Sequence, residues 1–149
     1  MNESKLDVKK RAVIEIAENL FLSQGLATTE MKEIARCASI SRSTLYRMFD
    51  SRETLAFAVA DKCLHELFDP KPMEIYGTDR SGFEILRSYS SNLIETMIQG
   101  VRYVKYLSEF DQMFSGDYPD TPEARKYVQF NRQRHDRQIL LNILRLGPV

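Results

Sequence analysis

Hydrophobic residues recur every three to four positions along most of the chain, which is the spacing of one face of an α-helix. The first run, residues 8–24, places Val13, Ala17 and Phe21 on such a face, and Gly25 follows where a helix would end. No stretch alternates as a β-strand does, and the 149 residues include only 6 glycines and 5 prolines. The pattern predicts an all-α fold with helices over residues 8–24, 28–39, 41–49, 52–68, 82–99, 101–114 and 122–146.

Two of these helices, residues 28–39 and 41–49, are too short to bury enough surface by themselves. Thr28 or Thr29 is predicted to cap the first and Ser41 the second, because hydroxyl oxygens accept hydrogen bonds from the first free amides of a helix. Longer helices on both sides must cover the pair. Two short helices joined by a tight turn form a helix-turn-helix, whose second helix can enter the major groove of DNA.

The second short helix has an outward face whose side chains suit DNA recognition. Leu45, Met48 and Phe49 are predicted to face inward. Arginine forms two hydrogen bonds to guanine, and hydroxyl side chains reach phosphates or base edges. Residues 36–52 hold four arginines and one aspartate, so a local charge of +3 lies within a chain of formal net charge 0. A solvated helical face is the alternative interpretation of the outward residues, which are Arg42, Ser43, Thr44, Tyr46 and Arg47.

The short helices and their flanks also share a set of residues with a known family. These residues are Leu20-Phe21, Gly25, Thr29, Ile34-Ala35, Ala38, Ile40-Ser41, Thr44-Leu45-Tyr46, Phe49 and Ser51-Arg52-Glu53-Thr54-Leu55. Over residues 11–59 the pattern resembles the signature of the tetracycline repressor (TetR) family of transcriptional regulators. The resemblance implies a homodimer that binds a near-palindromic operator on double-stranded DNA. It also implies a small-molecule effector that binds the C-terminal body and releases the DNA.

The resemblance further implies roles for single residues. Three positions depart from the family pattern: Ser39 replaces the usual turn glycine, Ser43 replaces a common glycine, and Met48 stands where histidine or tyrosine is frequent. At Ser39 a residue with a Cβ must therefore adopt the turn conformation that glycine usually adopts. The changes at Ser43 and Met48 leave the base preference, and hence the operator sequence, outside what the family pattern predicts. The expected phosphate contacts are Thr29, Thr44, Tyr46 and Arg52, and the expected base contacts are Arg42, Ser43 and Met48.

Three regions are predicted along the chain. Residues 1–52 form the DNA-binding domain, residues 53–72 a connecting helix, and residues 73–149 a helical regulatory domain for ligand binding and dimerisation. Because the family continues with two further long helices, the regulatory domain is expected to be incomplete. The apolar segment 139–144 is expected to be covered by a partner or by such helices.

The aromatic and methionine residues of the regulatory domain have helical spacing, and a hydrophobic core is the simpler interpretation of them. The alternative is a ligand pocket between the last three predicted helices. Its polar contacts would be Tyr89, Tyr103, Tyr106 and Gln112.

Other classes of protein find little support in the sequence. Cys37 and Cys63 stand far apart without metal-ligand spacing, so we expect reduced thiols, no metal and no cofactor. No glycine-rich phosphate loop or catalytic triad pattern is present, and the chain has only two histidines, so we expect no enzyme. No apolar leader or membrane-spanning stretch occurs, which predicts a cytoplasmic protein. A protein-interaction module that uses the helix-turn-helix only as scaffold remains the alternative.

Overall fold

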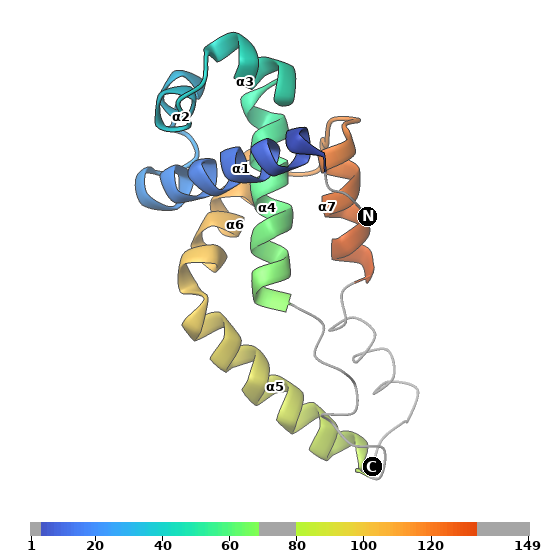
Figure 1. Cartoon of the computed structure of the whole chain (residues 1–149). Helices are drawn as coiled ribbons and strands as arrows, with labels where there is room; N and C mark the ends of the chain where they lie inside the picture. Colours follow the sequence, from blue (N-terminus) through green and yellow to red (C-terminus); the bar gives the residue numbers. More distant parts are fainter. Residues whose placement is uncertain (1–3, 69–79, 134–149) are drawn as a thin grey trace.

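The computed structural model describes residues 4–68 and 80–133, and all regular secondary structure within them is helical. This confirms the all-α prediction. Figure 1 shows α4 running along the molecule, α1 crossing it, α7 beside it, and α5 leading away from this group. The predicted last helix beyond residue 133 and the apolar segment 139–144 lie outside the described residues. The helices are α1 (Lys5–Gln24), α2 (Met31–Cys37), α3 (Arg42–Met48), α4 (Arg52–Phe68), α5 (Gly82–Gln99), α6 (Val101–Met113) and α7 (Pro122–Gln133).

α1 begins three residues earlier than predicted because a capping box stabilises its first turn. The Ser4 hydroxyl accepts a hydrogen bond from the Asp7 amide at 3.1 Å, and the Asp7 carboxylate accepts one from the Ser4 amide at 3.3 Å. The hydrogen bonds from Ser4 lower the pKa of Asp7. A hydrophobic pattern cannot report such a start, because both residues are polar and exposed.

The N-cap predicted for the first short helix is wrong. The Thr28 hydroxyl donates to the carbonyl of Gln24 at 2.6 Å, and the Thr29 hydroxyl donates to the carbonyl of Gly25 at 2.8 Å. Both threonines therefore bind carbonyls at the end of α1 rather than amides at the start of α2. The N-cap of α2 is Glu30, whose side chain makes no capping hydrogen bond.

The turn between α2 and α3 has the geometry of a Schellman motif. The Ile40 amide donates to the carbonyl of Ala35 at 3.1 Å, and the Ser39 amide donates to the carbonyl of Arg36 at 3.2 Å. Ser39 has φ of 53°, in the left-handed region that favours glycine. The expectation that a residue with a Cβ adopts a glycine turn is confirmed.

α4 is the helix around which the others pack. Phe57 on α4 is fully buried, and its ring centroid lies 4.8 Å from that of Phe110 on α6 and 5.8 Å from that of Tyr127 on α7. One cluster of buried side chains joins these residues to Phe21 of α1 and Leu45 of α3. The helix-turn-helix and the C-terminal body therefore share a single core.

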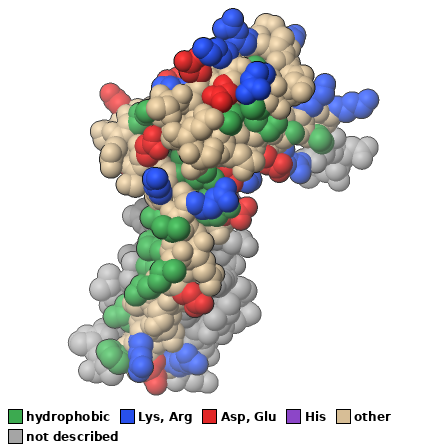
Figure 2. All heavy atoms as spheres, turned by 90° about the vertical axis from the view of Figure 1, so that its left-hand side faces the viewer, with side chains coloured by type: hydrophobic (Ala, Val, Ile, Leu, Met, Phe, Trp, Pro, Cys, Tyr) green, Lys and Arg blue, Asp and Glu red, His purple; other side chains and the backbone are tan. Residues whose placement is uncertain are grey.

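The prediction of a core for all the aromatic and methionine residues is wrong for part of α5. Phe83 is 62% exposed, and Met97 and the α6 residue Met113 are exposed as well. Ile98, a further apolar residue of α5, is 70% exposed. Hydrophobic side chains form a line along α5 in Figure 2. Helical spacing identifies an apolar face, but it does not say whether another element covers that face.

Asp61 on α4 is the one described residue with a buried side-chain oxygen, Oδ1, that has no hydrogen-bond partner. Burial raises the pKa of Asp61, while the charges of His65 and Lys126 oppose the shift. The His65 ring stacks on Phe130 at 3.6 Å between centroids. The ionised form of Asp61 therefore costs folding free energy.

Replacing Ser39 by glycine should stabilise the fold. The left-handed conformation costs an L-residue about 1–2 kcal/mol, and the extra chain entropy of glycine offsets part of this gain, so we expect a net gain of about 0.5–1 kcal/mol. Urea denaturation followed by circular dichroism measures the change. Ser39→Ala keeps the Cβ and should bring no gain; equal gains in both variants would contradict the strain argument.

Asp61→Asn should raise the urea midpoint at pH 7. The folded-state pKa of Asp61 lies above its ordinary value of 3.8, so the destabilisation is complete above the folded pKa and disappears as the pH falls below 3.8. The gain from asparagine should shrink over the same range. Asp7→Asn is the matched contrast, because the lowered pKa of Asp7 predicts a loss at pH 7 instead. A pH-independent gain at Asp61 would count against the burial argument.

Candidate DNA-binding site

α3 has one buried and one exposed side, as the sequence predicts. Leu45 and Phe49 are buried in the core, and Met48 joins them at 9% exposure. Arg42, Ser43, Tyr46 and Arg47 are exposed, and Tyr46 is 46% exposed. The side chains that can donate or accept hydrogen bonds therefore lie on the solvent side of the helix.

A group of three hydroxyl side chains marks the start of α3. Ser41 is the N-cap, as predicted, and its Oγ accepts from the Thr44 amide at 3.1 Å. The same Oγ lies 3.0 Å from Ser43 Oγ and 2.8 Å from Thr44 Oγ1. Arg47 donates from Nη2 to Thr44 Oγ1 at 3.2 Å. Thr44, which is half-buried, therefore orients Arg47 rather than projecting alone into solvent.

Two residues expected to contact DNA are buried. Thr29 is fully buried, and its hydroxyl donates to the carbonyl of Gly25. The Met48 side chain packs into the core. In this structure neither side chain is accessible to a ligand, and the resemblance that suggested both carries no information on burial.

Arg52 lies at the start of α4 and is half-buried. Its Nη1 donates to the carbonyl of Ala27, in the turn between α1 and α2, at 3.3 Å. The Ala27 amide donates to Glu109 Oε1 on α6 at 3.2 Å. Arg52 and Glu109 thus hold one turn from two sides, so the position of the helix-turn-helix depends on α4 and α6.

The cationic surface extends beyond α3. Lys32, Arg36 and Arg42 line a hollow between α2 and the start of α3, together with the acid Glu33. Lys10 of α1 lies 5.8 Å from the ring centroid of Phe49, next to the end of α3. Lys and Arg side chains gather at the end of the molecule formed by α2 and α3 (Figure 2). Sequence reasoning missed Lys10 and Lys32, although the basic run around Lys10 was a visible signal.

The four residues predicted to line a ligand pocket occupy different environments. Tyr106 is buried and donates its hydroxyl to the carbonyl of Ala56 at 2.9 Å. Tyr89 is buried in a small cluster on α5, Tyr103 is half-buried beneath a guanidinium, and Gln112 is exposed. Tyr106 has a structural role in joining α6 to α4.

Other kinds of site gain no support from the described residues. Within residues 4–68 and 80–133 no group of three or more His, Cys, Asp or Glu side chains could hold a metal ion. No helix in those ranges has the length and apolar character to cross a membrane. Cys37 is exposed, and burial raises the pKa of the Cys63 thiol to about 12, so Cys63 is a protonated core residue.

Residues 13–59 match the family model described as bacterial regulatory proteins, tetR family. The uncharacterized HTH-type transcriptional regulator Rv1255c of Mycobacterium tuberculosis (strain ATCC 25618 / H37Rv) is 50% identical over 46 residues, 31% of this chain and 23% of that protein. The HTH-type transcriptional repressor KstR2 of Rhodococcus jostii (strain RHA1) is 33% identical over 60 residues, 40% of this chain and 29% of that protein. The matched part spans between a fifth and a third of the length of these curated relatives.

The fold extends the likeness beyond this segment. The solved structure of the ketosteroid transcriptional regulator KstR2 of Mycobacterium tuberculosis has a TM-score of 0.60 at 20% identity, over 99% of this chain and 69% of that chain. At this identity the likeness shows the fold alone. The names of these relatives describe transcriptional regulators. Residues 13–59, about a third of the chain, are thus similar to the helix-turn-helix domain of the tetR family of bacterial regulatory proteins.

Proposed function

We propose that the protein is a sequence-specific DNA-binding transcriptional regulator of the cytoplasm, a repressor that a small-molecule effector releases from its operator. The observation that carries the proposal is the exposed side of α3, where Arg42, Ser43 and Tyr46 face solvent while Leu45 anchors the helix in the core. The match of residues 13–59 to the family supports it.

In the proposed complex, α3 lies in the major groove. Arg42 and Ser43 reach base edges, and the Arg42 guanidinium suits the two acceptors of guanine. Tyr46, Arg47 and Arg52 contact phosphates and fix the register of the helix on the duplex. Lys10 and Lys32 extend the phosphate contacts on either side, because they flank the exposed end of the domain.

A single α3 of seven residues covers only a few base pairs, so we propose that a second copy reads a related half-site. Two-fold symmetry of the protein then requires a near-palindromic operator whose half-sites lie about 34–36 Å apart. The domain division proposed from the sequence fits this use, with residues 1–52 on DNA and residues 53–72 leading into the regulatory part.

Arg42→Ala should weaken binding to the preferred operator about tenfold to a hundredfold, because a bidentate arginine–guanine contact contributes about 1–3 kcal/mol of discrimination. The operator is first selected from a random DNA pool, and fluorescence anisotropy then measures affinity at fixed salt. Arg87→Ala, an exposed arginine of α5, is the control and should leave affinity unchanged. Unchanged affinity in the double variant Arg42→Ala, Tyr46→Ala would instead favour the protein-interaction module.

Lys10→Ala should weaken binding to all DNA sequences alike. A lost phosphate contact reduces the slope of log K against log salt by about 0.9, whereas Arg42→Ala should change sequence preference. Titration at several salt concentrations with operator and random DNA separates the two effects. Lys105→Ala on α6 is the matched control, and an unchanged slope in Lys10→Ala would remove Lys10 from the proposed interface.

A further inference from the structure

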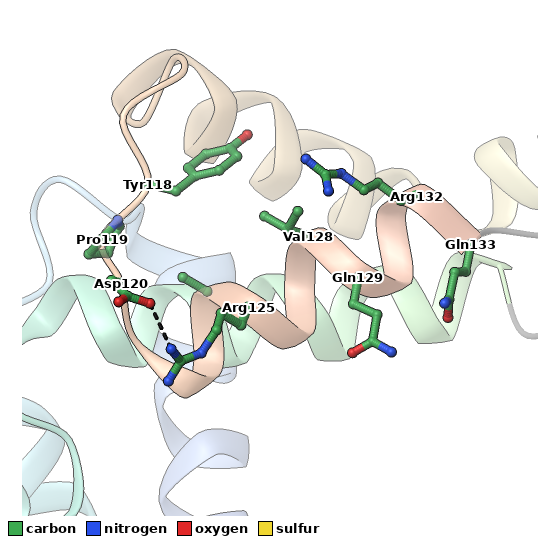
Figure 3. Close-up of a pocket in the computed structure, with 9 residues that line it drawn as sticks. Tyr118, Pro119, Asp120, Arg125, Val128, Gln129, Arg132 and Gln133 are labelled. Carbon is green, nitrogen blue, oxygen red and sulfur yellow. Dashed lines mark hydrogen bonds and ion pairs between the residues drawn. The ribbon is translucent and has the colours of Figure 1, made fainter.

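A groove of about 480 Å³ lies between the segment before α7 and α7 itself. Two neighbouring rows of α7 side chains form one wall, because residues four positions apart share a helix face. One row contains Val128 and Arg132, and the other contains Gln129 and Gln133 (Figure 3). Tyr118 forms the opposite wall. The volume lies in the range of small-molecule sites, about 300–1,000 Å³.

The groove combines an apolar floor with one available positive charge. Figure 3 shows the Tyr118 ring and the Arg132 guanidinium directed toward one another above Val128. Tyr118 is 42% exposed and Val128 is half-buried, so both present apolar surface to the groove. Arg132 forms no ion pair with a residue in the described ranges, whereas Arg125 pairs with Asp120. A ligand's negative charge would therefore lie at the Arg132 end.

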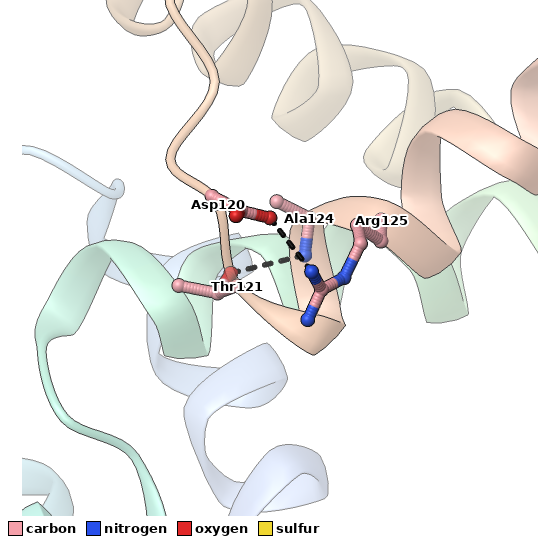
Figure 4. A network of polar contacts seen from close by, with 4 residues as sticks. All are labelled: Asp120, Thr121, Ala124 and Arg125. Atoms are coloured by element: carbon pink, nitrogen blue, oxygen red, sulfur yellow. Dashed lines mark hydrogen bonds and ion pairs between the residues drawn. The ribbon is translucent and has the colours of Figure 1, made fainter.

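Polar contacts hold the walls of the groove in place. Arg125 Nη1 donates to Asp120 Oδ1 at 2.8 Å, and the Ala124 amide donates to Thr121 Oγ1 at 3.2 Å. Figure 4 shows both contacts at the first turn of α7. The second contact caps the helix, and the first joins the segment before α7 to its first turn. The groove is thus formed before any ligand binds, which lowers the ordering cost of binding.

We propose that this groove binds an apolar small molecule that carries a carboxylate, sulfonate or phosphate group. The anionic group accepts charge-assisted hydrogen bonds from Arg132. The apolar part lies against Tyr118 and Val128, and the amides of Gln129 and Gln133 hydrogen-bond to the polar edge of the ligand. This site lies on the outer side of α7 and includes none of the tyrosines of α5 and α6 suggested by the sequence.

One side chain of the groove, Tyr118, is in direct contact with the central helix α4. Tyr118 packs edge-on against Phe57 of α4 with 5.4 Å between ring centroids. α4 begins at Arg52, which donates to the turn between α1 and α2. A ligand that displaces Tyr118 therefore acts on a side chain of the helix that holds the DNA-binding domain. This regulatory step rests on the proposed function, but binding in the groove does not.

Two fluorescent probes test the binding without DNA. 8-Anilinonaphthalene-1-sulfonate carries the required anion, and N-phenyl-1-naphthylamine has the same rings without it. The full chain has no tryptophan, so excitation of the probes meets no indole emission. Arg132→Gln should weaken binding of the sulfonate about tenfold, as expected for a hydrogen bond to a charged group, and weaken the neutral probe less than about twofold.

Variants elsewhere identify the location of the probe. Arg87→Gln removes an exposed arginine of α5 and should leave the affinities for the sulfonate and for the neutral probe unchanged. Circular dichroism verifies that each variant keeps its helix content. Val128→Asp should weaken both probes, because it places a charge on the apolar floor. If Ile98→Ser on the exposed face of α5 abolishes sulfonate binding and Arg132→Gln does not, the proposal is overturned.

The regulatory step has its own measurement. Saturating sulfonate should lower operator affinity in the wild-type chain and not in Arg132→Gln. If saturating sulfonate leaves operator affinity unchanged while probe binding still depends on Arg132, the regulatory step is overturned and the binding site itself stands. A chain that binds the probe through Arg132 but never binds DNA would refute the proposed function alone.

Discussion

The burial of Phe57 at the centre of α4 is the packing constraint on which the rest of the structure depends. Its ring meets Phe110 of α6, Tyr118 of the segment before α7, and Tyr127 of α7. Edge-on aromatic pairs add about 0.5–1.5 kcal/mol beyond their buried area. Because α4 also packs against α1, loss of this ring would loosen both ends of the molecule together.

This packing joins α3 to the same core as α4 and α6. Three residues separate the end of α3 from the start of α4, where Arg52 donates to the carbonyl of Ala27. Glu109 binds the amide of the same residue from α6. The two contacts hold the turn before α2 from different helices, so a relative shift of α4 and α6 must break or strain one of them.

The sequence predicts this arrangement well where local signals are strong. Ser41 caps α3 as its position suggests, and the bounds of α4 and α5 agree with the pattern. The N-cap prediction for Thr29 is wrong because a threonine between two helices can donate to carbonyls of the preceding helix as well as accept from amides of the following one. The prediction that Phe83 belongs to the core is wrong for another reason, because its exposure depends on which element covers α5. Tertiary packing determines both the hydrogen-bond partner of Thr29 and the exposure of Phe83, and a local sequence pattern holds no information on tertiary packing.

The distribution of acids along the helices bears on how a chain of formal net charge 0 can carry the DNA-binding surface proposed for α3. α1, α2, α4, α5 and α7 each have an acid in the first turn, where it stabilises the positive end of the helix dipole. α3 and α6 have none there, and α3 begins with Arg42. This forfeits about 0.3–1 kcal/mol of helix stability. It leaves Arg42 without an acidic neighbour in the first turn of α3, so in the proposed complex the DNA phosphates supply the negative charge near it.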